Sequence, residues 1–343
     1  MSTKPVIVVL DDFERVARSY VDWSAIEAKA DLRIYTEALR GQALMDALQP
    51  AQALCLMRDR TPITAEVLAQ LPNLELVHFT GTRNGALDTQ ALNARNIPVL
   101  DTGWGPNKDA TIELTWALIL AAQKRLVSQH NALLRGQWRP HDSLSPVLHG
   151  QTIGIAGLGE IGGRVANVAR AFGMKVVAWS PNMTAERAAA KGATGVSFNE
   201  LVSTSHIVTT HLVLGPATKN LFGAAQFAAM RSDAIFVNTS RAGLADEVAL
   251  AAALRAGCPA MAALDVFSVE PVSASHPFIT LPSVVLTPHL GFVCEPVVSQ
   301  VFWRRGGGAP CVARRCTTTA NSGAVVRGLR PCSAVSLGKQ LLT

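Results

Sequence analysis

Three ionisable side chains in the second half of this 343-residue chain, Arg241, Glu270 and His289, are of types that bind a carboxylate and move a proton. The planar guanidinium of an arginine can hold a carboxylate through two hydrogen bonds. An imidazole titrates near neutrality and suits a proton donor to a carbonyl oxygen, and a carboxylate beside it orients the ring and favours its protonated form. Each residue also has a plain structural interpretation, as a surface ion pair, a turn residue before proline and a loop histidine. The chemistry therefore depends on the fold bringing the three together.

A glycine-rich hexapeptide, Gly157-Leu158-Gly159-Glu160-Ile161-Gly162, follows a buried-strand pattern and opens a segment with apolar residues at helical spacing. In that context the pattern is typical of dinucleotide binding, whereas without it the motif is weak evidence. The first glycine permits a tight turn, the second lets the backbone approach a pyrophosphate, and the third allows close helix packing. The helix amino terminus supplies N–H groups and a positive dipole. We therefore predict a nicotinamide dinucleotide cofactor, with an ordinary glycine-rich turn as the alternative.

The residues expected at the adenosine ribose leave the choice between NAD and NADP open. Roughly 20 residues past the glycines, an Asp or Glu would accept the ribose hydroxyls of NAD. The chain reads Trp179-Ser180-Pro181-Asn182 there. Ser180 can bond a ribose and does not repel a 2′-phosphate. Arg187 and Lys191 lie downstream and could assist, although a solvated helix face is their expected location. NAD is the expected cofactor, with NADP as the alternative.

Alternation of short apolar runs with helical spacing predicts an α/β fold of two doubly wound parallel-sheet domains. In the first hundred residues we expect strands at 6–10, 34–35, 74–79 and 97–100, with a helix-like segment at 63–71. A long helix begins near Ala110 and is apolar on more than one face, as a helix between two domains would be. Further strands are expected at 151–156, 175–179, 207–210, 235–238, 261–266 and 284–287.

Three later segments, together with the glycine motif, resemble the signature blocks of the D-isomer-specific 2-hydroxyacid dehydrogenases. They read Val237-Asn238-Thr239-Ser240-Arg241-Ala242-Gly243, Leu264-Asp265-Val266-Phe267-Ser268-Val269-Glu270-Pro271 and Leu286-Thr287-Pro288-His289-Leu290-Gly291. The resemblance covers about residues 5–300, and four blocks in family order are far more specific than any one alone. It implies a Rossmann nucleotide-binding domain at 102–291, inserted into a flavodoxin-like substrate domain at 1–101 that about 292–303 completes.

The resemblance also implies an activity and partners. Members transfer a hydride between NAD(P)(H) and a small D-2-hydroxy acid or 2-keto acid, such as D-lactate, D-glycerate, glyoxylate, hydroxypyruvate or phosphoglycerate. Arg241 would bind the substrate and a His289-Glu270 pair would act as acid and base. Formate dehydrogenases carry glutamine at the position of Glu270, which disfavours that branch. A homodimer is expected by the same resemblance.

Further contacts are carried over from the family position by position. Asp265 matches the residue that holds the nicotinamide. The loop with Gly81, Thr82 and Arg83 resembles the one whose backbone holds the substrate carboxylate, although Arg83 stands where many members have a second glycine. The residues expected to contact the cofactor are Gly157, Leu158, Gly159, Glu160, Ile161, Gly162, Ser180, Leu212, Thr239, Ser240 and Asp265.

Charge and composition favour a globular, cytoplasmic protein. The net charge of +6 arises in residues 304–343, which hold seven of the 31 Lys and Arg and none of the 25 Asp and Glu. The remaining 24 basic and 25 acidic residues give no electrostatic reason to bind nucleic acid or a membrane. No apolar run approaches the roughly 20 residues of a membrane span. Three of the six cysteines are scattered and three lie in the tail at 311, 316 and 332, and with no Cys-x-x-Cys pair no metal site is expected.

The last forty residues depart from the family pattern. A helix could begin at 297–303, but Arg304-Arg305-Gly306-Gly307-Gly308-Ala309-Pro310 would stop it. Two explanations remain open, a frameshift near codon 303 and a natural disordered basic tail. Two functional alternatives follow as well: a nucleotide-sensing protein similar to a transcriptional co-regulator, or an inactive product of a gene with a damaged 3′ end.

Overall fold

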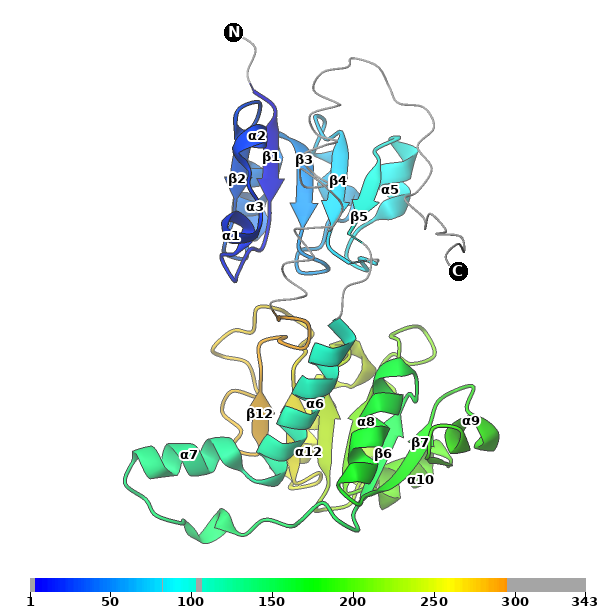
Figure 1. Cartoon of the computed structure of the whole chain (residues 1–343). Helices are drawn as coiled ribbons and strands as arrows, with labels where there is room; N and C mark the ends of the chain where they lie inside the picture. Colours follow the sequence, from blue (N-terminus) through cyan, green and yellow to red (C-terminus); the bar gives the residue numbers. More distant parts are fainter. Residues whose placement is uncertain (1–3, 82, 103–106, 295–343) are drawn as a thin grey trace, which may run out of the picture. The chain divides into compact units, whose positions relative to one another are not determined.

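The computed structural model describes residues 4–294 with the exception of 82 and 103–106. The described residues form two compact units, 4–102 and 107–294, each with its own parallel sheet (Figure 1). The predictions for the tail at 304–343, and for a closing segment beyond residue 294, lie outside the described residues. The domain boundaries at 101 and 291 stay a prediction.

The first unit has a five-stranded parallel sheet in the order β2-β1-β3-β4-β5. This is the flavodoxin-like order, in which the chain reverses direction across the sheet between β1 and β3. The structure adds one strand, β3, that was not predicted from the sequence. The strands are β1 Val6–Val9, β2 Asp31–Ile34, β3 Ala51–Leu56, β4 Leu76–Phe79 and β5 Val99–Asp101.

Short helices cover both faces of this sheet. Side chains of β1 alternate between the two faces, so Ile7 packs with Trp23 and Ile26 while Val8 packs with Leu44 on the opposite side. The two helices on the first side are α1 Ala17–Tyr20 and α2 Ser24–Glu27. The three helices that contribute to the opposite side are α3 Gly41–Leu48, α4 Ala65–Ala69 and α5 Thr89–Ala94.

The second unit has a seven-stranded parallel sheet in the order β12-β11-β10-β9-β6-β7-β8. Its order reverses between β6 and β9, as in a Rossmann sheet, so the predicted fold class is confirmed. All six predicted strands match within two residues at each end, and the structure adds the two-residue strand β8, which was not predicted. The strands are β6 Thr152–Ala156, β7 Lys175–Trp179, β8 Thr194–Gly195, β9 Ile207–Thr210, β10 Ile235–Asn238, β11 Met261–Leu264 and β12 Val284–Leu286.

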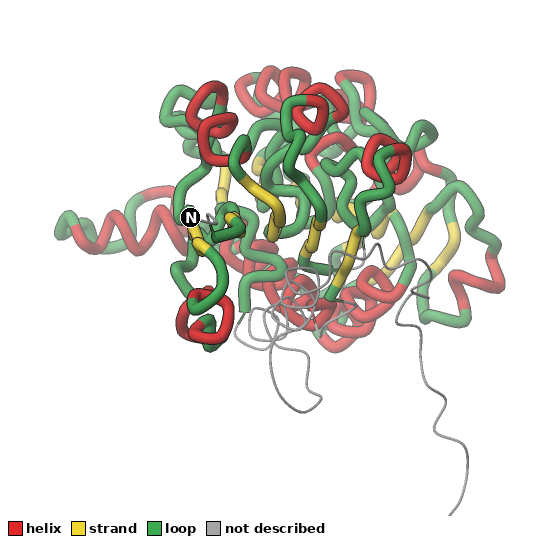
Figure 2. The backbone as a smooth tube through the Cα atoms, turned by 90° about the horizontal axis from the view of Figure 1, so that it is seen from above, coloured by secondary structure: helices red, strands yellow, loops and turns green. Residues whose placement is uncertain are grey.

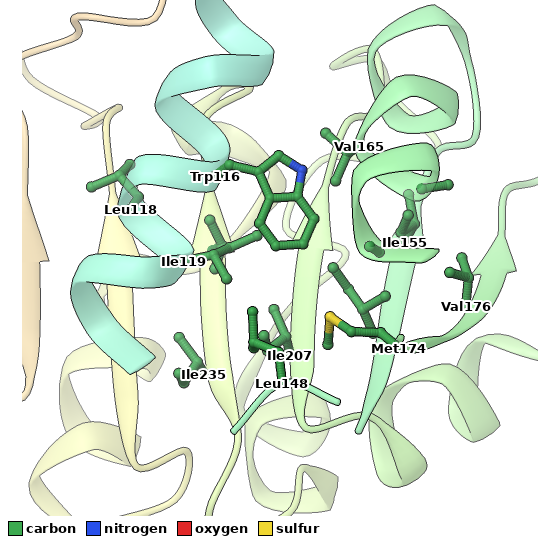
Figure 3. Packing of buried hydrophobic residues seen from close by; sticks show 14 of the residues in the cluster. Trp116, Leu118, Ile119, Leu148, Ile155, Val165, Met174, Val176, Ile207 and Ile235 are labelled. Carbon is green, nitrogen blue, oxygen red and sulfur yellow. The ribbon is translucent and has the colours of Figure 1, made fainter. Parts of the chain in front are cut away.

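Helix α6, Asn107–Gln123, is the long helix that the sequence predicted. Trp116 and Ile119 are buried in a core that also contains Val165 of helix α8 and Ile155 of strand β6 (Figure 3). Burying apolar side chains against both a helix and the sheet explains why α6 is apolar on more than one face. The other helices of this unit are α7 Leu126–Leu134, α8 Glu160–Ala171, α9 Ala185–Ala189, α10 Phe198–Thr204, α11 Ala224–Ala229 and α12 Glu247–Arg255, with 3-10 turns at His141–Ser143 and Ala242–Leu244.

Helix α7 and the segment after it extend away from the rest of the second unit (Figures 1 and 2). We call residues 126–147 the arm. The arm carries an unusual share of the large apolar side chains that stay exposed, namely Leu126, Val127, Leu133, Leu134, Trp138, Leu144 and Val147. Clustered exposed apolar groups of this kind mark an interaction surface more often than single ones do.

The histidine in β4 gives the protein a pH-dependent stability. Burial lowers the pKa of His78 to about 4, and its Nε2 finds no hydrogen-bond partner among the described residues. In the unfolded chain the same group takes up a proton near pH 6.5. The contribution of neutral His78 to the free energy of unfolding is therefore complete above pH 6.5. It is lost as the pH falls from 6.5 towards 4, and the loss reaches up to about 3 kcal/mol.

We predict that His78→Leu loses less stability than the wild type between pH 7 and about pH 4.5, because the unfolded state of the variant no longer gains that proton. Urea unfolding at a series of pH values measures the difference. His149→Gln, at an exposed position outside the arm, is the control and should keep the wild-type pH dependence. Equal pH dependence of His78→Leu and the wild type would contradict the prediction.

Candidate active site

The glycine-rich turn between β6 and α8 has the shape that a dinucleotide site needs. Gly157 has a φ of +100°, and a Cβ there would lie 2.7 Å from the carbonyl carbon and oxygen of His211. A Cβ on Gly162 would collide with the carbonyl oxygen of Gly157. A Cβ on Gly159 would meet nothing within 4 Å, so open space lies at the amino terminus of α8. The first and third glycines are thus required by packing, and the second leaves a cradle for a ligand.

Lys191 reaches back over this turn instead of lying on a solvated helix face, as the sequence had suggested. Its Nζ donates to the carbonyl oxygens of Leu158 at 2.9 Å and Gly159 at 2.8 Å. Arg187 remains exposed and donates to the carbonyl oxygen of Asn182 at 2.5 Å. Ser180, half-buried after β7, lies in the same loop as Asn182. The reason for the difference is tertiary, because the loop after α9 folds against α8.

The other predicted residues of this turn have separate environments. Leu158 is buried, and Ile161 packs against the core of the unit. Glu160 is the first residue of α8 and forms an ion pair with Lys108 of α6. The glycine-rich turn is therefore tied to α6 on one side and to the loop after α9 on the other.

The turn after β10 is held by Asn238, a residue that was not singled out as a site residue. Its Oδ1 accepts from the Ser240 amide at 3.0 Å, and its Nδ2 donates to the Arg241 carbonyl oxygen at 2.9 Å. The Ser240 hydroxyl donates to the carbonyl oxygen of Leu212 at 3.0 Å, which joins this turn to the loop after β9. The Thr239 hydroxyl pairs with that of Thr115 at 2.8 Å. These bonds fix the backbone from which the half-buried Arg241 projects.

Asp265, directly after β11, holds the segment that carries His289. Its Oδ1 accepts from the Thr287 hydroxyl at 2.6 Å and the Leu290 amide at 2.7 Å. Its Oδ2 accepts from the Gly291 amide at 2.9 Å. Asp265 is fully buried, and this burial raises the pKa of its carboxyl group, although these hydrogen bonds act in the opposite direction. That Asp265 also contacts the nicotinamide stays a prediction.

Glu270 and His289 form the pair that the sequence predicted. His289 Nδ1 lies 2.7 Å from Glu270 Oε2, and the other carboxylate oxygen accepts from the Phe267 amide at 2.9 Å. An ionised carboxylate only accepts, so with Glu270 in that form Nδ1 is the donor of this hydrogen bond. His289 has a φ of +55°, a strained left-handed conformation for a residue other than glycine. No hydrogen bond from a described residue occupies its Nε2, which can therefore face a substrate oxygen.

The strand order explains why these residues share one edge. The parallel register pairs Asn238 of β10 with Leu264 of β11, and Leu264 with Leu286 of β12. The segments that follow these three strands carry Arg241, Asp265 with Glu270, and His289. They therefore leave the carboxyl edge of the sheet side by side, which is where ligands bind in open α/β folds.

The predicted substrate loop lies in the first unit. Gly81 has a φ of +94°, and its amide donates to the Thr102 hydroxyl at 2.8 Å. Arg83 is exposed. Thr82 lies outside the described residues. The role of this loop in binding a substrate carboxylate stays a prediction.

The described residues contain neither a metal-binding cluster nor a membrane-spanning helix. No group of three or more His, Cys, Asp or Glu side chains has an arrangement suited to a metal ion. No helix in the described part of the chain has both the length and the apolar character needed to cross a membrane.

Comparison with known families decides the identity of the chain. Residues 116–291 match the model of the D-isomer specific 2-hydroxyacid dehydrogenase, NAD binding domain. The chain is 38% identical over 256 residues to a glyoxylate reductase of Aeropyrum pernix, a stretch that covers 72% of this chain and 76% of that protein. The chain belongs to the D-isomer specific 2-hydroxyacid dehydrogenase family.

Other relatives agree with this family membership. A D-3-phosphoglycerate dehydrogenase of Archaeoglobus fulgidus is 32% identical over 284 residues, which cover 83% of this chain and 53% of that protein. The chain thus spans about half the length of this relative. The crystal structure of a phosphoglycerate oxidoreductase from Vibrio cholerae O395 has a TM-score of 0.78 at 34% identity, and the match covers 88% of this chain and 95% of that chain. The family and fold predicted from the signature blocks are confirmed.

Substitutions at Gly157 and Gly159 should have different effects, one on stability and the other on ligand binding. Gly157→Ala should destabilise the protein by roughly 2 kcal/mol or more, because it combines a positive φ with a collision against the backbone of His211. Gly159→Ala should leave the melting temperature much closer to that of the wild type and should weaken NADH binding, because its methyl group enters the open cradle.

Thermal melting and titration of NADH fluorescence measure the two effects on the same samples. The prediction is contradicted if Gly159→Ala binds NADH as tightly as the wild type, or if Gly157→Ala melts at the wild-type temperature.

Proposed function

We propose that the protein transfers a hydride between NAD(P)(H) and a small D-2-hydroxy acid or its 2-keto acid. The observation that carries the proposal is the His289-Glu270 pair, held at 2.7 Å on a turn that Asp265 anchors. It lies at the same sheet edge as Arg241. A paired imidazole with an available Nε2 is suited to proton transfer at a carbonyl or alkoxide oxygen.

In the direction of reduction, His289 donates the proton on Nε2 to the carbonyl oxygen of the substrate. Glu270 keeps the ring oriented through Nδ1 and stabilises its positive charge before the proton leaves. Arg241 holds the substrate carboxylate through its guanidinium and so fixes the carbon that is to be reduced. In the direction of oxidation, His289 accepts the proton from the hydroxyl group of the substrate.

The turn at 157–162 fits a dinucleotide. The open space above Gly159 and the N–H groups of the first turn of α8 are suited to a pyrophosphate. Ser180 would contact the adenosine ribose, and Leu212, Thr239 and Ser240 would line the path along the sheet edge. When bound, the nicotinamide supplies or accepts the hydride.

NAD is the proposed cofactor, and the loop after β7 favours tolerance of NADP. No acidic side chain stands at 179–182 to repel a 2′-phosphate. Lys191 places a positive charge on the glycine-rich turn, and Arg187 places another at Asn182. We expect both reduced cofactors to support turnover.

The substrate site is proposed to include the loop with Gly81, Thr82 and Arg83, and the two domains to divide near residues 101 and 291. Resemblance to the family supports both statements. The relatives named glyoxylate reductase and D-3-phosphoglycerate dehydrogenase indicate small 2-keto and 2-hydroxy acids as the substrate class.

We further propose that the protein is a homodimer and that the arm binds a second copy. Resemblance to the family and the exposed apolar side chains of the arm support this. Leu134 and Trp138, 73% and 74% exposed, are among the side chains of the arm that a partner would cover.

The double variant Leu134→Glu/Trp138→Glu should therefore sediment as a monomer, while the wild type has twice the mass of one chain. Val248→Glu, at an 81% exposed position on α12, is the matched control and should remain a dimer. A wild-type protein that sediments as a monomer at micromolar concentration would refute the proposal, as would a dimeric double variant.

The activity is tested by oxidation of NADH and of NADPH with glyoxylate, hydroxypyruvate and pyruvate offered in turn. We expect turnover by the wild type and a loss of kcat of about 100-fold or more in His289→Ala, because general acid catalysis is removed. Arg241→Ala should raise KM for the keto acid, and His149→Gln, at an exposed position outside the arm, should match the wild type. Absence of turnover from folded protein that binds NADH would contradict the proposal and favour a nucleotide sensor. Protein that shows no turnover, does not melt cooperatively and does not bind NADH would indicate an inactive product.

A further inference from the structure

A carboxylate on helix α12 reaches the loop that carries Glu270. Glu247 is the first residue of α12, and its Oε1 accepts a hydrogen bond from the Ser268 amide at 2.8 Å. Its Oε2 accepts a second hydrogen bond from the Ser268 hydroxyl. The side chain of Glu247 is only 19% exposed, although Ser268 itself lies at the surface. Both carboxylate oxygens of Glu247 thus accept hydrogen bonds from a loop 21 residues away in the sequence.

Two adjacent amides of this loop are bound by two different carboxylates. The Phe267 amide donates to Glu270 at 2.9 Å, and the Ser268 amide donates to Glu247 at 2.8 Å. Glu270 then uses its remaining oxygen for His289 Nδ1 at 2.7 Å. Hydrogen bonds at both ends and the backbone between Phe267 and Ser268 therefore connect the first turn of α12 to the imidazole.

An aromatic cluster lies beside Glu247. His276 Nε2 lies 3.8 Å from Glu247 Oε2. The His276 ring contacts Phe267 edge-on and Phe278 at a tilt, with centroid distances of 5.8 and 5.1 Å. Both phenylalanines are buried. The carboxylate of Glu247 therefore borders this cluster as well as Ser268.

We propose that Glu247 is a positioning residue for the His289-Glu270 pair. It does not act on the substrate. It holds the 267–270 turn so that Glu270 presents its carboxylate to His289 Nδ1 in one orientation. This inference rests on the proposed function, since its effect on turnover requires His289 to be the proton donor. Displacement of a catalytic group by a fraction of an ångström to about 1 Å is enough to slow a reaction about 100-fold.

A purely structural role for Glu247 makes a different prediction. An acidic side chain in the first turn of a helix stabilises the helix dipole, and its loss lowers stability without altering a distant site. The neighbouring Asp246 provides the matched control. It caps the same helix by accepting from the amides of Val248 and Ala249 at 2.9 and 3.0 Å, and no hydrogen bond links it to the loop at 267–270.

The first experiment compares Glu247→Ala, Glu247→Gln and Asp246→Ala with the wild-type holoenzyme. We expect Glu247→Ala to lower kcat by about 10- to 100-fold while the KM for the keto acid and the Kd for NADH change little. Glu247→Gln should recover most of the activity, because its amide oxygen still accepts from the Ser268 amide. Asp246→Ala should lower the melting temperature and leave kcat unchanged. The proposal is overturned if Asp246→Ala lowers kcat as much as Glu247→Ala does, or if Glu247→Ala retains wild-type kcat.

The second experiment does not depend on turnover and therefore separates failure of this inference from failure of the proposed function. Proton NMR in water detects the His289 Nδ1 hydrogen bound to Glu270, and the signal is assigned by its absence from His289→Ala. We expect the signal to move or broaden in Glu247→Ala and to persist in Glu247→Gln and Asp246→Ala. An unchanged signal in Glu247→Ala would overturn the proposal whether or not the wild type reduces keto acids.

Discussion

The buried carboxylate of Asp265 is the interaction on which the candidate active site depends. A carboxylate withdrawn from water costs free energy unless each oxygen receives hydrogen bonds. Among the described residues, Asp265 meets this condition through Thr287, Leu290 and Gly291, which flank His289. The turn cannot relax away from β11 without leaving a buried charge unpaired. This constraint explains how His289 keeps its strained left-handed backbone and how its ring stays within 2.7 Å of Glu270.

The glycine-rich turn on the cofactor side of the site is likewise constrained by close packing. Gly157 and Gly162 are required because the backbone of the turn passes close to His211 and to itself, while the space at Gly159 is left open. Lys191 ties this turn to the loop after α9 by two hydrogen bonds. Both ends of the site are therefore formed by loops at the carboxyl edge of one rigid sheet. Each loop is fixed by hydrogen bonds to groups far away in the sequence.

Much of this arrangement could be predicted from local sequence. The β-branched runs at Ile207–Thr210 and Ile235–Asn238 give the buried strands that they predict, and the glycine motif lies between a strand and a helix as expected. Strand β3, Ala51–Leu56, was missed because its Ala and Leu residues favour helices, although Pro50 separates it from α3. Its place in the sheet is decided by the strands on both sides of it.

The contacts of Lys191 and Glu247 could not be predicted, because their partners are distant in the sequence. Lys191 bonds to residues more than 30 positions earlier, and Glu247 bonds to a loop 21 positions later. Nothing in the local spacing of either residue indicates these contacts. Asp265 was recognised through the family pattern, but its bonds to the turn at 287–291 follow only from the pairing of β11 with β12.

A double-mutant cycle on Asp265 and Glu270 tests the central claim most directly. The specificity constant kcat/KM for a keto acid is measured for the wild type, Asp265→Asn, Glu270→Gln and the double variant. If both residues act by holding His289, each single change displaces the same ring, and the second change adds much less than it does alone. Strictly multiplicative losses would contradict the account, because Asp265 would then act independently of the histidine.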